Sequence, residues 1–135
     1  MVGRGTNKKS IAYVGNLVEF LDFGLGFEKG YHIFNYADKP DLTTNELIRI
    51  ARNTLGRNGN SDIHIPYFIG LFVGYIFDLL AFITGRSFSV SSIRIKKFCA
   101  DTTVSSKSIS QTELHPPYSL EEALRRTISY EFPVH

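Results

Sequence analysis

The sequence contains very little cysteine, and this scarcity limits the kinds of site that it can build. Cys99 is the single cysteine among 135 residues, which excludes an internal disulfide framework and a metal site of the two-cysteine kind. The histidines are scattered, with no two of them four residues apart, so no metal site is expected. They are His32, His64, His115 and His135. A reducing cytoplasm fits this composition best.

The chain also lacks a strong excess of one charge. Fifteen Lys and Arg residues face 13 Asp and Glu residues, giving a net charge of +2 and a sequence pI near 8.7. A dedicated nucleic-acid binder with a broad basic face is therefore disfavoured. No apolar run follows the first charges, so a secretory signal is not expected and the cytoplasm remains the predicted location.

Short β-rich runs and capped helices alternate in the first part of the chain. Residues 10–14 (SIAYV) predict a strand, and Asn16 indicates the cap of a helix that ends by Gly24 or Gly26. Two further short strands are expected at residues 31–35 (YHIFN) and 62–65 (DIHI). Alternating elements of this kind favour a layered α/β or α+β fold over a helical bundle.

Two later helices carry clearer boundary signals. Thr43 and Glu46 have the spacing of a capping box, and Gly56 supplies the stop. Ser119 and Glu122 repeat the capping-box spacing at the start of a helix near the end of the chain. The sequence therefore predicts a small mixed α/β (α+β) domain of several helices with a few short strands.

An apolar run over residues 67–84 has two interpretations. Its single charge and the spacing of Gly70 and Gly74 are typical of a packed membrane helix. The run is slightly short of a hydrocarbon core, however, and Asp78 would lie within the bilayer at a cost of about 2.5–3.5 kcal/mol. The alternative is a helix buried in protein, on which these three residues share a face that lets another backbone approach. We favour the buried helix. Because a small domain does not cover such an apolar surface fully, we expect the protein to self-associate through it.

Motifs for nucleotide chemistry are absent or incomplete. The glycines of residues 24–30 (GLGFEKG) follow a helix instead of joining a strand to a helix, so they fail as a dinucleotide fingerprint, and no G-x-x-x-x-G-K-[ST] phosphate loop occurs. Lys8 and Lys9, just before a strand, and Arg94, a potential bidentate donor, are candidate anion-binding residues. A solvated surface cation is the alternative for each.

Several segments taken together resemble one enzyme family. GRGTNKKSIAYVGNLVEF (residues 3–20), SSIRIKKFCADTTVSSKSI (residues 91–109) and HPPYSLEEALRRTISYEF (residues 115–132) follow in the order found in the C-terminal part of the extended short-chain dehydrogenase/reductases. This is the NAD-dependent epimerase/dehydratase family, which acts on nucleotide sugars. The resemblance covers residues 3 to 132.

The resemblance implies that residues 1–135 form a single substrate-binding domain, without the N-terminal Rossmann domain of the family. Met1 stands where that substrate domain's first diagnostic loop begins, which suggests a shortened chain. The family's Tyr-x-x-x-Lys pair is absent, so no catalytic residue is assigned and the chain alone is expected to be inactive. NAD is expected in the full-length parent and no cofactor in this fragment.

The resemblance also implies roles for particular residues. Lys9 and Arg94 match positions that approach the diphosphate of a nucleotide sugar, so a UDP-sugar or dTDP-sugar is the expected ligand. Asn16 is interpreted as a helix cap, and Asp101 as a turn or cap residue before a short helix near residue 105.

Two other hypotheses remain open at this point. The chain could be a non-catalytic interaction or membrane-associated protein that uses the apolar helix of residues 67–84, although a membrane location is not favoured. It could also be half of a two-chain enzyme whose Rossmann domain is a separate polypeptide. A homodimer, or an assembly with that missing domain, is the expected kind of protein partner, and nucleic acid is not.

Overall fold

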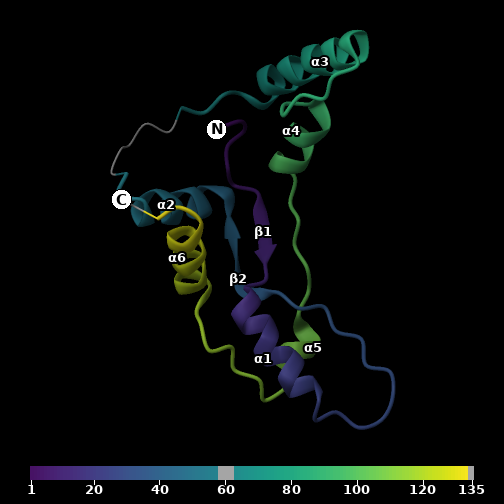
Figure 1. Cartoon of the computed structure of the whole chain (residues 1–135), viewed down its shortest axis with the longest axis vertical. Coiled ribbons are helices and arrows are strands. Elements are labelled where there is room, and N and C mark those ends of the chain that lie inside the picture. Colours follow the sequence, from purple (N-terminus) through teal and green to yellow (C-terminus); the bar gives the residue numbers. More distant parts are fainter. Residues whose placement is uncertain (58–62, 134–135) are drawn as a thin grey trace. The chain divides into compact units, whose positions relative to one another are not determined.

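A computed structural model describes residues 1–57 and 63–133 of the chain. Within these ranges lie six helices and one two-stranded sheet (Figure 1), so the predicted small mixed α/β fold is confirmed. The chain divides into two compact units. The helical unit comprises residues 1–7 and 59–101, and the sheet unit comprises residues 8–58 and 102–135.

The sheet unit is built on an antiparallel strand pair. Strand β1 (Lys8–Ile11) pairs with β2 (Asp38–Thr43), and Lys9 lies opposite Leu42. On its other edge β1 forms a short bridge with Thr102, through two backbone hydrogen bonds of 2.9 Å. Hydrogen bonds on both edges therefore fix the backbone of β1, including the position of Lys9.

The strand predictions are only partly correct. β1 begins two residues before the predicted strand at residues 10–14. Residues 31–35 form no strand. Instead, the ring centroid of Phe34 lies 5.6 Å from that of Phe20 and 5.3 Å from that of Phe27. These aromatic contacts hold the segment as an irregular loop, whose alternating apolar residues have no neighbouring strand to pair with.

The described helices of the sheet unit are α1 (Val14–Gly24), α2 (Thr44–Thr54), α5 (Lys107–Ser110) and α6 (Leu120–Glu131). The capping box of α2 forms as predicted, because the Thr43 hydroxyl accepts from the Glu46 backbone N–H at 3.2 Å while the Glu46 carboxylate accepts from the Thr43 N–H. Helix α6 begins at its predicted cap, Ser119, whose hydroxyl accepts a backbone N–H. Capping chemistry therefore placed the starts of both helices correctly.

The core of the sheet unit lies where α2 and α6 pack together (Figure 1). Ile50 of α2 and Leu120 and Ala123 of α6 are buried. The small side chain of Ala123, with only 1% of its surface exposed, allows close contact between neighbouring elements. This apolar packing stabilises two helices that would be marginal in isolation.

The helical unit consists of α3 (Tyr67–Thr84), α4 (Ser92–Cys99) and the first residues of the chain. Val2 pairs with Ile65 in a parallel bridge. The strand predicted over residues 62–65 is therefore reduced to this isolated bridge at Ile65, and Asp62 lies outside the described residues.

Helix α3 has the predicted boundaries, and this chain buries little of it, so burial against a partner surface stays a prediction. Of its 18 residues only Gly70 and Gly74 are buried. The glycine face itself matches the prediction, because a Cβ on Gly74 would lie 2.8 Å from the backbone of Ser92 on α4. By length and composition α3 could cross a membrane, with a mean hydropathy of 1.9. Gly74 therefore serves contact with α4, and Gly70 serves contact with Val2, while most of the helix remains exposed.

Candidate functional site

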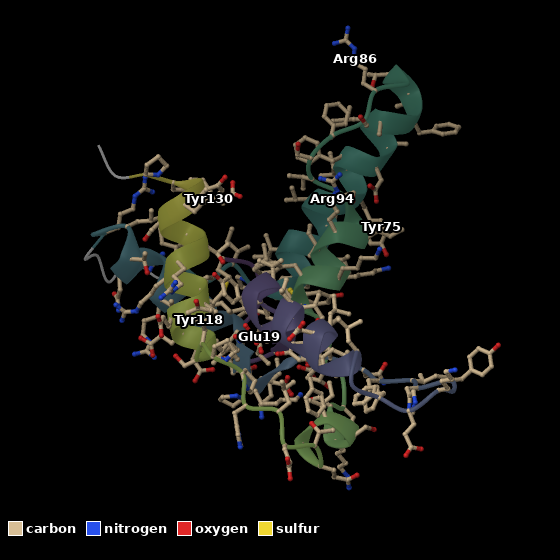
Figure 2. The ribbon with its side chains drawn as sticks, turned by 60° about the horizontal axis from the view of Figure 1, so that its bottom comes forward. Glu19, Tyr75, Arg86, Arg94, Tyr118 and Tyr130 are labelled. Carbon is tan, nitrogen blue, oxygen red and sulfur yellow. The ribbon has the colours of Figure 1, made fainter. Side chains whose placement is uncertain are left out.

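Arg94 lies in the first turn of α4, on the helical unit (Figure 2). Its backbone N–H donates to the Ser91 hydroxyl at 3.3 Å, and Nη1 of its guanidinium donates to the Ser89 carbonyl at 3.0 Å. The side chain is exposed. One nitrogen of the guanidinium is thus hydrogen-bonded to the loop before α4. This bond restrains an otherwise flexible side chain at the surface.

Arg94 also lines an apolar groove of about 470 Å³ in the helical unit. The other lining residues are Val2, Ile65, Ile69, Gly70, Val73, Ser89, Val90, Ser91, Ile95 and Phe98. The volume is that of a small-molecule site. A single cation beside branched aliphatic side chains suits an anionic ligand that carries an apolar group.

Lys9 lies in the other unit, on β1, and its side chain is half-buried. Pairing of β1 with β2 on one side and with Thr102 on the other fixes the backbone of Lys9. Because Lys9 belongs to the sheet unit and Arg94 to the helical unit, contact of both with one diphosphate stays a prediction.

Asn16 is not the helix cap that the sequence indicates. The N-cap of α1 is Tyr13, which makes no side-chain cap hydrogen bond. Asn16 lies within α1 with 0% of its surface exposed. Its amide nitrogen donates to Asp38 Oδ1 and to the Tyr118 carbonyl, both at 2.9 Å, and its amide oxygen accepts from the Tyr118 N–H at 3.1 Å. Asn16 therefore joins three separate segments of the sheet unit.

Asp38 is the acceptor at the centre of this buried cluster. Besides Asn16, it accepts from the Tyr13 backbone N–H at 2.7 Å and from the Tyr36 hydroxyl at 2.9 Å. Burial, followed by this hydrogen bond to Asp38, raises the pKa of Tyr36 well above its usual range. The phenol therefore stays protonated and keeps donating. Sequence reasoning missed Asp38 because it stands in a stretch without a strand pattern.

Two further predictions concern Asp101 and the histidines. Ala100 caps the C-terminal end of α4 and Ser106 is the N-cap of α5, so Asp101, which lies between them, caps neither helix. Among residues 1–57 and 63–133, no three His, Cys, Asp or Glu side chains converge as metal ligands would. His135 lies outside the described residues.

Comparison with known proteins gives one clear relationship. The chain is 46% identical over 133 residues to an N-acetyl-alpha-D-glucosaminyl-diphospho-ditrans,octacis-undecaprenol 4-epimerase of Escherichia coli O157:H7. The matched region is 98% of this chain and 40% of the relative. No family model and no solved structure matches. Over nearly its whole length the chain is thus related to part of a sugar 4-epimerase, and the resemblance to the epimerase family that its motifs predict is confirmed.

Proposed function

We propose that this chain is the substrate-binding part of a sugar 4-epimerase and that it binds a sugar linked to a diphosphate. The observation that carries the proposal is the 46% identity to an epimerase over 98% of the chain. The substrate named for that relative has a diphosphate next to its sugar. The ordered motifs also favour a sugar diphosphate, because they resemble those of a family that acts on nucleotide sugars.

Lys9 and Arg94 are the proposed diphosphate-binding residues. A lysine on a hydrogen-bonded strand and an arginine tethered to its own loop are both partly ordered before binding, which lowers the entropic cost of holding an anion. Cation–phosphate hydrogen bonds are charge-assisted and about twice as strong as neutral ones. Because the two residues lie in different units, the effect of each on ligand binding is tested separately.

The group on the far side of the diphosphate distinguishes two candidate substrates. A nucleoside, as in UDP-sugars or dTDP-sugars, presents several polar atoms that a site must satisfy. The groove beside Arg94 instead presents mainly aliphatic side chains. We therefore favour a polyprenol diphosphate, the kind of carrier in the relative's name, with its first isoprene units in this groove.

The described residues do not fit NAD. A dinucleotide site needs a glycine-rich turn between a parallel strand and a helix, whereas the described sheet is a single antiparallel pair. The sequence also has no Tyr-x-x-x-Lys pair. We propose that the chain alone binds its substrate without converting it, and that a cofactor-binding part completes the enzyme.

The test is an amide NMR titration of the isotope-labelled chain with three ligands. They are UDP-N-acetylglucosamine, N-acetylglucosamine diphosphate carrying a geranyl group, and NAD. We expect shifts at the amides around Lys9 and Arg94 with the geranyl ligand, smaller shifts with the UDP-sugar and none with NAD. The absence of shifts with both sugar diphosphates would overturn the proposed function for this chain.

Matched variants test the two assigned cations. We expect Lys9→Ala and Arg94→Ala each to weaken sugar-diphosphate binding about tenfold. Lys29→Ala and Arg57→Ala remove exposed cations elsewhere in the sheet unit and should leave the affinity unchanged. Equal affinities for all four variants would contradict the site assignment while leaving the substrate class intact.

A further inference from the structure

The side of α3 that faces away from α4 is a continuous apolar surface. Five residues spaced three or four positions apart form it, which places them in one line along a helix. This outer stripe consists of Phe68, Phe72, Ile76, Leu79 and Ile83. Its members keep between 44% and 70% of their surface exposed, so the part of the chain that the structure describes leaves the stripe uncovered.

The opposite side of α3 is occupied by α4. Gly74 meets the Ser92 backbone there, and Asp78 Oδ2 accepts from the Ser92 N–H at 3.1 Å. Asp78 is half-buried and holds the first turn of α4 against α3. The helix pair thus has two different sides, an apolar outer stripe and a side that carries a second, more polar helix.

Positive charge lies on α4 and just beyond the end of α3. The cations of the helical unit are Arg4, Arg86, Arg94, Lys96 and Lys97, and its described acidic residues are Asp78 and Asp101. Figure 2 shows Arg86 extending beyond the C-terminal end of α3. Tyr75 lies at the flank between the two sides, where its hydroxyl accepts from Lys96 Nζ at 3.1 Å. An aromatic ring with a cation at its polar end is typical of the boundary between lipid and water.

We propose that α3 lies in the plane of an anionic lipid bilayer, with the outer stripe among the acyl chains and α4 at the level of the headgroups. A helix in this position buries its apolar face to a depth of roughly 5–10 Å, which suits a stripe on one side of the helix. The excess of cations over described acids in this unit complements anionic headgroups. The outer stripe contains no polar side chain, so it offers no specific hydrogen bonds to a protein partner.

The same contacts oppose a transmembrane position. The 18 residues of α3 span about 27 Å, slightly less than a hydrocarbon core of roughly 30 Å. Crossing would also draw Asp78 and the cations of α4 into the core, because α4 packs along the glycine face. The inference goes beyond the proposed function and does not require it, although a lipid-linked substrate would lie at the same surface.

A tryptophan reporter tests the position directly, because the chain contains no tryptophan of its own. Phe72→Trp places one fluorophore on the outer stripe, and the control Val18→Trp places one at a similarly exposed position on α1. With vesicles of phosphatidylcholine and phosphatidylglycerol (3:1), we expect a blue shift and quenching by brominated lipid for Trp at position 72 only. The same signal from both reporters, or from neither, would overturn the proposal.

A second pair of variants measures how much binding depends on the stripe. We expect Phe72→Glu/Leu79→Glu to reduce co-sedimentation with these vesicles at least about tenfold. The control Val18→Glu/Leu21→Glu makes the same charge change at exposed apolar positions of α1 and should leave it unchanged. Higher salt should weaken vesicle binding of the unmodified chain. Circular dichroism verifies that every variant is folded.

Other occupants of the stripe give different results. If a second copy covers it, the blue shift at position 72 appears without vesicles and grows with protein concentration, and this outcome would overturn the proposal. Failure to bind vesicles in any of these assays would do the same. Sugar-diphosphate titration without vesicles is a separate measurement, so loss of either property leaves the other testable.

Discussion

At the scale of single residues, Asn16 stands out because its polar amide is completely buried and needs hydrogen-bond partners inside the protein. Its amide is fully buried and satisfies Asp38 and both backbone groups of Tyr118. Asn16→Ala would remove all three of these hydrogen bonds from the interior of the sheet unit, and Asp38 would keep only the bonds from Tyr13 and Tyr36. We expect the free energy of unfolding to fall by about 2–4 kcal/mol, measured by urea denaturation.

The matched control for this substitution is Asn53→Ala. Asn53 is exposed on α2, and alanine has the higher helix propensity, so the change should be within about 0.5 kcal/mol or slightly stabilising. A comparable loss for both variants would contradict the structural role of the buried amide.

Glu46 makes part of the stability dependent on pH. The backbone N–H of Thr43, then its hydroxyl, donate to the Glu46 carboxylate and lower its pKa. Because the folded pKa is below the unfolded value of about 4.3, this stabilisation is fully present above the unfolded pKa and is lost as the pH falls through the folded pKa. We expect the advantage of the unmodified chain over Glu46→Gln to shrink in that range, as thermal unfolding between pH 3 and 7 would measure.

Thr43→Ala provides the comparison for the pH effect. It removes the hydroxyl donor but keeps the backbone donor, so the pH-dependent difference between Glu and Gln at position 46 should become smaller in this background. A difference that stays the same size would mean that the hydroxyl does not contribute to the shift in pKa.

At the scale of elements, Gly74 controls the packing of α3 against α4. An added Cβ would lie 2.8 Å from the Ser92 backbone and 2.9 Å from Ile95 Cδ1. Since a backbone cannot rotate away as a side chain can, α4 must shift, and we expect Gly74→Ala to cost about 1–3 kcal/mol. Hydrogen exchange of the α4 amides measures the effect.

Gly24→Ala is the control for a glycine that packing does not require. Its added Cβ would make only ordinary contact, at 3.8 Å from Phe27. The substitution lies at the end of α1, where alanine should be neutral or stabilise the helix by up to about 1 kcal/mol. Faster exchange in α1 after this change would contradict the distinction between the two glycines.

Helices were more predictable than strands in this chain. The caps at Thr43 and Ser119 and the length of α3 are local signals, so they could be read from the sequence. Strand β2 was missed because Pro40 lies within it, and proline argues against a strand unless the position is an edge or an irregularity. The exposure of α3 could not be read either, because apolar composition does not reveal whether a neighbour exists.

The candidate site was less predictable than the fold. Arg94 was chosen for its side-chain chemistry and by motif resemblance, and its role stays a prediction. The groove beside it could not be predicted, because Val2 and Ile65 reach it only through tertiary contacts. The role of Asn16 was misassigned for the same reason: the polar groups that it satisfies come from residues 38 and 118. Such clusters depend on distant segments and leave no local pattern.

At the scale of the whole molecule, the two compact units should respond separately to substitution. We expect Gly74→Ala to speed hydrogen exchange in α4 without changing it in α2, and Asn16→Ala to do the reverse. The reason is that α4 and α2 belong to different units with their own internal contacts. Equal acceleration in both helices would show that the chain opens as one cooperative body.

The bond from Asn16 to Tyr118 joins residues 102 positions apart, which has a consequence for synthesis on the ribosome. The helical unit takes its segments from residues 1–7 and 59–101, so all of them are synthesised before Tyr118. The sheet unit must wait for residues 102 onward, and its buried Asn16 remains without its last partner until then. We therefore expect the helical unit to be able to fold before the sheet unit is complete, and the closure of this long loop between residues 16 and 118 to be a slow step in folding.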